Sequence, residues 1–262
     1  MTFQEKIILS ILTLQMLFGY TVQLELPLIP KIDSQNIPNI TNSNFIAFNN
    51  SNSPRTIFHI EVFNNKTKIL WEYSMPKNQK GYFIDVIIND FDNNGSIEMI
   101  ATAYQDGKSD IFYIFNYEKS SFINEDPIIT GIKNRSNINN PRKMYAMSPE
   151  DNGQSIFLLT QGSPDRQVLM CAFIQNEIIE VASLGKKYLN QTISTIDLSL
   201  GDFDGDGGQD IFILDKGFKP TGYFIYSNGT EEKSNLTNYP RIRSINKIGL
   251  DINFDGSDDL IM

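Results

Sequence analysis

One acidic nine-residue pattern occurs three times in this chain, and its residue types are those that bind a hard cation. It reads Asp-Phe-Asp-Asn-Asn-Gly-Ser-Ile-Glu at 90–98, Asp-Phe-Asp-Gly-Asp-Gly-Gly-Gln-Asp at 202–210 and Asp-Ile-Asn-Phe-Asp-Gly-Ser-Asp-Asp at 251–259. Ca²⁺ takes about six to eight oxygen ligands, and carboxylates crowded in one turn repel each other unless a cation lies between them. The pattern therefore predicts three calcium-binding loops.

The candidate ligands stand at loop positions 1, 3, 5, 7 and 9. They are Asp90, Asp92, Asn94, Ser96 and Glu98 in the first loop, Asp202, Asp204, Asp206, Gly208 and Asp210 in the second, and Asp251, Asn253, Asp255, Ser257 and Asp259 in the third. The second loop has four carboxylates where each of the others has three and an Asn, so it is predicted to bind calcium most tightly. The alternative is that Asp, Asn and Gly only form tight turns here.

The residues that follow each loop exclude an EF-hand. An EF-hand loop has about twelve residues, ends in a bidentate Glu and leads into a helix. The twelfth positions here are Ala101, Ile213 and Met262, and an apolar run follows position 9 in every copy. Short apolar runs of this kind favour buried strands, so the expected arrangement is strand, loop, strand.

The loops belong to a longer repeat. A decayed copy at 148–155, with few carboxylates and expected to bind no metal, fills the gap between the first two loops and gives a period of about 50 to 58 residues. One period offers four strands, at 83–88, 97–104, 111–117 and 128–132, and residues 56–63 and 68–73 fit strands of an earlier period. Four strands per unit are typical of a propeller blade. The predicted fold is all-β, a partial β-propeller of four-stranded blades with calcium-binding loops.

The loops, their flanking strands and the period together resemble FG-GAP or VCBS repeats, which occur in the integrin alpha-subunit propeller and in secreted bacterial proteins. The resemblance covers residues 44–262, and the segment 201–211 matches the family motif best. It implies a calcium-stabilised propeller, with about three full blades and two partial ends on this chain.

The N-terminal residues predict export. Residues 1–19 have a short polar start ending at Lys6 and a mostly apolar stretch at 7–18, which is typical of a secretory signal peptide and short for a membrane span. An uncleaved anchor is the alternative. Residues 20–43 are predicted to be an extended linker. The mature chain is expected to be secreted or at the cell surface, without a membrane span.

Composition narrows the chemistry. The net charge of −9 argues against nucleic-acid binding, and a single cysteine, Cys171, allows no internal disulfide. The only histidine is His59, so the sequence gives little support for a catalytic triad or a zinc site. A pair of glycosidase carboxylates stays open. Trp71 and Tyr73 are a candidate sugar platform, although packing in a core is the commoner role of such residues.

The expected function is that of a secreted or cell-surface calcium-binding repeat protein that binds an extracellular protein or glycan, as in adhesion. The alternative is a segment of a polysaccharide-acting enzyme on the same scaffold. A third possibility is a scaffold segment with no activity of its own. A cluster of Asp, Glu, Arg and Tyr outside the metal loops would favour the enzyme.

Overall fold

A computed structural model gives the fold of the chain. It describes residues 21–23, 42–49, 55–63, 66–77, 79–105, 108–118, 121–122, 127–133, 141–147, 156–162, 166–215, 220–236, 242 and 245–261. These residues divide into two compact units, one of Met1–Asp90 with Gly95–Ile129 and one of Phe91–Asn94 with Thr130–Met262. Each unit is described by itself.

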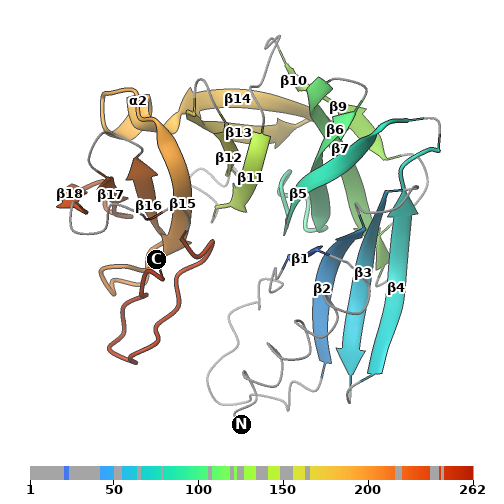
Figure 1. Ribbon diagram of the computed structural model, residues 1–262, viewed down its shortest axis with the longest axis horizontal. Helices are drawn as coiled ribbons and strands as arrows, with labels where there is room; N and C mark the ends of the chain where they lie inside the picture. Colours follow the sequence, from blue (N-terminus) through green and yellow to red (C-terminus); the bar gives the residue numbers. More distant parts are fainter. Residues whose placement is uncertain are drawn as a thin grey trace. The chain divides into compact units, whose positions relative to one another are not determined.

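The first unit holds two antiparallel sheets, each with its strands in chain order (Figure 1). One sheet consists of β1 (Thr21–Gln23), β2 (Asn42–Asn49), β3 (Thr56–Phe63) and β4 (Lys66–Ser74). The other consists of β5 (Gly81–Asn89), β6 (Glu98–Gln105), β7 (Lys108–Glu118) and β8 (Ser121–Phe122), with β9 (Ile128–Thr130) also paired to β7.

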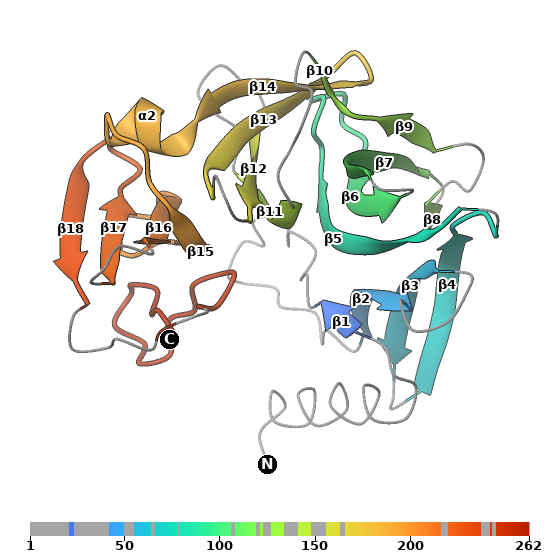
Figure 2. The ribbon, with the colours of Figure 1, turned by 45° about the horizontal axis from the view of Figure 1, so that its top comes forward.

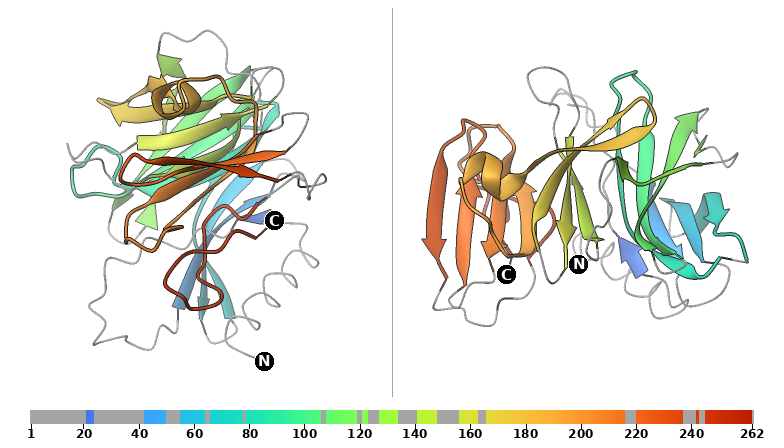
Figure 3. Two further views of the ribbon diagram at one scale, coloured as in Figure 1. Left: turned by 90° about the vertical axis from the view of Figure 1, so that its left-hand side faces the viewer. Right: turned by 90° about the horizontal axis from the view of Figure 1, so that it is seen from above.

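The second unit also holds two sheets. The first has the order β10 (Ile132–Lys133), β14 (Glu177–Ser183), β13 (Val168–Ile174), β12 (Ile156–Gln161) and β11 (Pro141–Ala146). After the short helix α2 (Leu184–Tyr188), the second has β15 (Thr195–Gly201), β16 (Asp210–Asp215), β17 (Thr221–Ile225) and β18 (Glu231–Asn235), which run side by side in the right-hand view of Figure 3.

The core of each unit is formed by inner strands that are buried on both faces. β6, β12 and β16 are almost entirely buried along their length. In the first unit Phe83, Tyr113 and Phe115 pack in one cluster, and in the second Leu158 and Ile211 pack in another. Burying one such side chain contributes about 1.5–3 kcal/mol to stability. Because both faces of these strands are buried, their sequences are continuous apolar runs and not alternating patterns.

The all-β prediction is confirmed, and most strands lie where the sequence places them. The strand predicted at 128–132 is the exception, because it is divided between two sheets. Ile128–Thr130 pairs with β7, whereas Ile132 and Lys133 pair in parallel with β14. Burial of Ile132, which is 4% exposed, stabilises this second pairing.

The predicted N-terminal segments are only partly described. The signal peptide predicted at 1–19 lies outside the described residues. Within the predicted linker at 20–43, Thr21–Gln23 forms β1 and pairs with Phe48, Ala47 and Ile46 of β2. This part of the predicted linker is therefore a strand of the first sheet. Among the helices that the structure describes, none is long and apolar enough to cross a membrane.

Candidate metal-binding loops

The three acidic loops connect strands, as predicted, but they do so in two ways. The first joins β5 to β6 and the second joins β15 to β16, each at the end of an antiparallel ladder of several residue pairs. The third loop is flanked by one isolated antiparallel bridge, between Leu250 and Asp259. Its segment, red in Figure 2, lies beside β15 and forms a parallel bridge from Ile248 to Leu200. The sequence at 148–155 lies outside the described residues.

All three loops use the same hydrogen bonds between carboxylates or amides and the loop backbone. The oxygen at position 1 accepts from the N–H at position 6 in the pairs Asp90–Gly95 at 2.9 Å, Asp202–Gly207 at 2.9 Å and Asp251–Gly256 at 3.0 Å. The oxygen at position 3 accepts from the N–H at position 5 in the pairs Asp92–Asn94 at 3.2 Å, Asp204–Asp206 at 3.1 Å and Asn253–Asp255 at 2.9 Å. These bonds turn the side-chain oxygens toward the inside of each loop.

The same two backbone positions are left-handed in every copy. Position 4 has positive φ at Asn93, Gly205 and Phe254, and position 6 has it at Gly95, Gly207 and Gly256. Gly and Asn adopt this conformation with little strain, whereas a bulky residue there is an outlier. Phe254, with φ of 62° and 88% of its surface exposed, is such an outlier. The loop conformation is thus kept even where the local residue opposes it.

Two of the loops bring three carboxylates together. One oxygen from each of Asp202, Asp204 and Asp210 lies within 4.8 Å of the others, and Asp90, Asp92 and Glu98 form an equivalent group. The position-9 residue is deeply buried in both groups, Asp210 being 0% exposed and Glu98 1% exposed. The third loop, all of whose residues are described, forms no such group.

The second loop is the most completely organised around its buried acid. The Oδ2 atom of Asp210 accepts hydrogen bonds from the N–H groups of Phe203 at 2.7 Å and Asp204 at 3.3 Å, and Oδ1 accepts from that of Ser227 at 2.8 Å. Burial raises the pKa of the Asp210 carboxyl, and the backbone bonds from Ser227 and Phe203 act in the opposite direction. The network fixes the carboxylate but leaves a concentration of acidic oxygens in one place.

One oxygen in this loop lacks a partner that a cation would supply. The Oδ1 atom of Asp202 is buried and accepts no hydrogen bond, although Oδ2 of the same group is bonded to Gly207. Buried polar atoms are nearly always paired with a donor, water or an ion. Together with the neighbouring carboxylates of Asp204 and Asp210, this unpaired oxygen fits a hard divalent cation.

The remaining predicted ligands of the second loop take other positions. Asp206 is not in the group of three. Its carboxylate accepts from the Ser227 hydroxyl at 3.0 and 3.3 Å and from the Gly208 N–H at 2.7 Å. Gly208 has no side chain and offers only its carbonyl oxygen. The four carboxylates counted in the sequence are therefore arranged as three converging groups and one that is bonded to the neighbouring turn.

The first and third loops contain similar side-chain pairs. Asn94 donates from Nδ2 to Oδ2 of Asp92 at 2.9 Å, and Asn253 donates from Nδ2 to Oδ2 of Asp255 at 3.0 Å. In the third loop, Asp255 also accepts from the Ser257 N–H at 3.0 Å. Ser96 of the first loop stands at the same loop position as Ser257 of the third. All fifteen predicted positions thus lie in the loops, but the structure gathers only six carboxylates into groups.

A second set of polar residues, five positions before each loop, was missed in the sequence. The residues at this offset are Asp85, Lys143, Asp197 and Asn246, when 148 is taken as the start of the decayed copy. Asp85 and Asp197 are 1% and 3% exposed, and each lies next to an irregularity in strand register. The signal that could have revealed them is a polar residue recurring at a fixed offset inside an apolar strand.

Asp197 connects three separate segments of the second unit. It accepts from Lys143 Nζ at 2.9 and 2.8 Å and from the Tyr145 hydroxyl at 3.0 Å, both on β11. It also accepts from the Ile245 N–H at 3.1 Å and from the N–H of its own neighbour Leu198 at 3.0 Å. Because its oxygens are fully engaged and Tyr145 is 1% exposed, this cluster stabilises packing rather than facing a substrate.

The candidate sugar platform of Trp71 and Tyr73 is part of the core. Trp71 is 5% exposed and meets Phe115 edge to face at 5.1 Å between ring centroids. His59 is also buried, with its ring 5.6 Å from that of Phe122. Burial lowers the pKa of His59, and the charge of Glu61 acts in the opposite direction.

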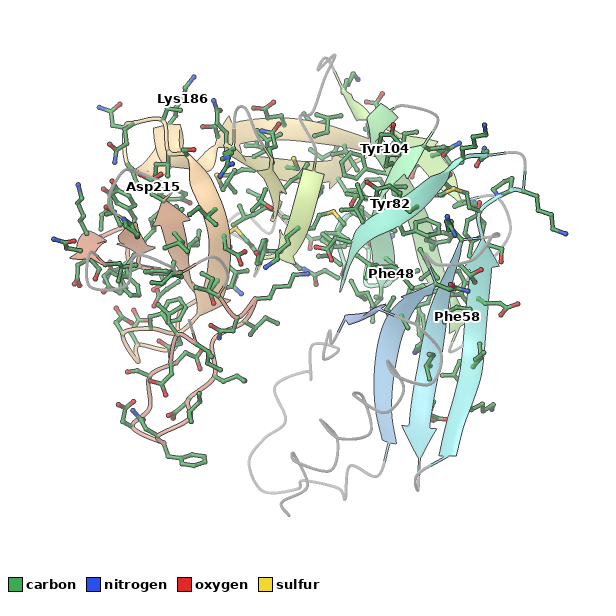
Figure 4. The ribbon with its side chains drawn as sticks, viewed as in Figure 1. Phe48, Phe58, Tyr82, Tyr104, Lys186 and Asp215 are labelled. Carbon is green, nitrogen blue, oxygen red and sulfur yellow. The ribbon has the colours of Figure 1, made fainter. Side chains whose placement is uncertain are left out.

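A different aromatic pair lies at the surface of the first unit. Tyr82 of β5 and Tyr104 of β6, labelled in Figure 4, face each other across the ladder with ring centroids 5.5 Å apart. They are 47% and 36% exposed. Their ring planes differ by 24°, so they form a stacked exposed pair.

Comparison with known proteins gives structural similarity only. The chain matches no family model and no curated protein. Among solved structures it is similar to the rhamnogalacturonan lyase PL11 of Bacillus licheniformis, with 10% identity and a TM-score of 0.42 over 80% of this chain and 48% of that one. It is also similar to the exotype rhamnogalacturonan lyase YesX, with 12% identity and a TM-score of 0.41 over 81% and 47%, and to the rhamnogalacturonan lyase YesW, with 12% and 0.41 over 81% and 49%. The chain spans about half the length of these proteins, and similarity of this size carries no argument about activity.

Proposed function

We propose that the chain is a calcium-stabilised segment of a β-propeller of the FG-GAP or VCBS type, exported from the cell, where it binds a protein or glycan. The four sheets, each a mostly antiparallel run of about four strands, would be its blades. The first and second acidic loops would then join the first two strands of their blades, and the third would stand at the same place in a partial blade. Calcium would replace the repulsion among the loop carboxylates with attraction.

The repetition of one loop geometry is the observation that carries this proposal. Three loops separated in sequence share hydrogen bonds from position 6 to position 1 and from position 5 to position 3. They also share left-handed residues at positions 4 and 6. Ordinary turns would not need the same side-chain oxygens at the same places, because most turn types tolerate many residues. The Oδ1 atom of Asp202, which is buried and lacks a hydrogen-bond partner, is a second and independent observation in favour of a bound cation.

The role proposed for calcium is structural. Asp202, Asp204 and Asp210 would hold the ion in the second loop, and Asp90, Asp92 and Glu98 would hold it in the first. The ion would supply charge neutralisation that keeps each hairpin closed. Extracellular calcium modules bind at about 10⁻⁴ to 10⁻³ M, and export would place the chain in a medium of that concentration.

Calcium titration by calorimetry of the full chain tests the proposal. We expect two stronger sites with dissociation constants at or below about 10⁻³ M, one lost on Asp92→Ala and the other on Asp204→Ala, and weaker binding at the third loop, whose carboxylates do not converge. Mg²⁺ at the same concentration is the control, since it demands a more regular octahedron of ligands. Absence of calcium binding at several millimolar, with the chain folded, would overturn the proposal.

The exposed Tyr82–Tyr104 pair supports a glycan as the ligand. Aromatic faces bury the apolar faces of sugar rings, and tyrosine hydroxyls add hydrogen bonds. Retardation of the chain in gels containing different extracellular polysaccharides measures this binding. We expect the double variant Tyr82→Ala/Tyr104→Ala to lose retardation, while Ile129→Ala, an exposed apolar residue of the same unit, keeps it.

The alternative is a polysaccharide-acting enzyme on the same scaffold. The cluster of Lys143, Tyr145 and Asp197 lies outside the loops, but its groups bond to each other, and Tyr145 and Asp197 are buried. That burial favours binding without catalysis. Release of reducing ends from any polysaccharide that the chain binds would instead favour the enzyme.

A further inference from the structure

The second and third acidic loops are bonded directly to each other. The N–H of Asp202 donates to Oδ2 of Asp258 at 2.8 Å, and the N–H of Asp258 donates to the carbonyl oxygen of Asp202 at 2.7 Å. Asp202 is position 1 of its loop, whereas Asp258 is position 8 of its own, next to Asp259 at position 9. Asp258 was not among the predicted ligands. Its side chain instead fixes the backbone of a ligand in the neighbouring loop.

The strands that lead into the two loops are in contact as well. The N–H of Gly249 donates to the carbonyl oxygen of Leu200 at 2.6 Å. The N–H of Leu200 donates to the carbonyl oxygen of Lys247 at 3.2 Å. Asp258 is half-buried where these two segments meet. A β-carbon placed on Gly201 would lie 2.8 Å from Oδ2 of Asp258, and one placed on Gly249 would lie 2.7 Å from the Asp258 β-carbon. Only glycine at these two places allows so close an approach.

The second and third loops differ in how well other contacts hold their backbone and position-9 residue in place. The second loop has a strand ladder on both sides and a buried position 9. The third has one flanking bridge and a half-buried Asp259, which accepts from the Ile252 N–H at 2.9 Å. A cation that fixes Asp202 in the second loop therefore also fixes Asp258, and with it the adjacent ligand Asp259.

We infer that cation binding at the second loop raises the affinity of the third loop, and that Asp258 is the positioning residue that couples them. This inference rests on the proposed calcium binding. Two nearby divalent cations repel each other, which would weaken the second binding event. The negative charge of Asp258 between the loops offsets that repulsion, and its two hydrogen bonds transmit order. The coupling is reciprocal, as any linkage between two binding equilibria must be.

The backbone N–H groups of Gly207 and Gly256 report each loop separately, because each donates to the position-1 carboxylate of its own loop. The experiment is a calcium titration of the full chain labelled with ¹⁵N-glycine, followed by NMR. When the second loop is disabled by Asp204→Ala, we expect the calcium concentration at the Gly256 midpoint to rise about fivefold or more, the usual lower range of such couplings. Asp92→Ala, the same change at position 3 of the first loop, is the matched control and should leave the Gly256 midpoint within about twofold.

Variants of the coupling residue complete the test. In an Asp258→Ala background, Asp204→Ala should no longer move the Gly256 midpoint. Asp258→Asn keeps an acceptor oxygen but loses the charge, and should retain only part of the effect. If Asp258→Ala does not fold, Gly249→Ala displaces the same side chain without changing either loop. An unchanged Gly256 midpoint after Asp204→Ala in the wild-type background overturns the coupling, as does an equal shift with and without Asp258. Failure of both glycines to respond to calcium overturns the proposed calcium binding itself.

Discussion

The loops at 202–210 and 251–259 have the same backbone but different surroundings. Both have left-handed residues at positions 4 and 6 and a position-9 carboxylate that accepts from the N–H of position 2. In the second loop, at 202–210, Asp210 is wholly buried between strands, and the carboxylates converge. In the third loop, at 251–259, Ile252 and Phe254 are exposed, and the carboxylates do not form a group. Loop conformation is thus set locally, whereas the convergence of ligands depends on strands that hold position 9.

Removing the support of the second loop is expected to have the largest effect. Asp197 stands five residues before the second loop, and Asn246 stands at the equivalent place before the third. Asp197→Ala leaves two buried donors, the Tyr145 hydroxyl and the Ile245 N–H, without their acceptor, and each loss should lower the free energy of unfolding by about 1 to 3 kcal/mol. Lys143, whose side chain is 37% exposed, can be solvated by water and adds less. Urea denaturation measures the change.

The exposed ion pair between Lys133 and Glu177, with side chains 49% and 46% exposed, is the control for this experiment. Its removal by Glu177→Ala should change the stability by no more than about 1 kcal/mol. A loss of similar size in the two variants would show that burial of Asp197 does not distinguish the support of the second loop.

Removal of calcium should have the next largest effect. A ligand that binds only the folded state at a hundredfold excess over its dissociation constant contributes about 2.7 kcal/mol per site. The melting temperature should therefore fall on addition of a chelator. Hydrogen exchange should rise more at Gly207 than at Gly256, because only the former lies in a loop with converging carboxylates. Equal rises at the two glycines would contradict this difference.

Relief of the backbone strain at Phe254 should stabilise the third loop. Phe254→Asn places at position 4 the residue type found there in the first loop, Asn93, which adopts positive φ more readily. Left-handed backbone costs most residues about 1 kcal/mol or more, so the free energy of unfolding should rise by about that amount. Urea denaturation measures the gain, and slower hydrogen exchange of the Gly256 amide locates it in the third loop. Ile252→Asn changes an exposed apolar residue of the same loop that is not left-handed, and should give no such gain.

The smallest expected effect is a pH dependence of the second loop in calcium-free buffer. Burial raises the pKa of the Asp210 carboxyl above 3.8, so the folded state holds this proton more tightly than the unfolded state. Its contribution to stability is fully present below pH 3.8 and is lost as the pH rises through the raised pKa. The stability difference between wild type and Asp210→Asn should change with pH in that window. A flat difference would contradict the role of burial.

Local features of the chain were predictable, and long-range ones were not. The strands around Ile100 and Ile211 and the loops beginning at Asp90 and Asp202 follow from apolar runs and from turn chemistry, which depend on neighbouring residues. The contact of Asp206 with Ser227 and that of Asp202 with Asp258 join residues 21 and 56 positions apart. No spacing rule relates such pairs. The propeller and its ligands remain predictions.

The pairing of β10 with β14 has a consequence for the order of folding. Ile132 and Lys133 leave the ribosome before the rest of their sheet, but their partners, Ile178 and Ile179, are synthesised about 45 residues later. Strands β11 to β13 can form successive hairpins as they emerge, whereas β10 must wait for the last strand. Contacts between distant residues form slowly because the intervening chain loses entropy on closure. This sheet should therefore complete its outer edge last, and refolding should show a slow phase that Ile132→Ala lengthens.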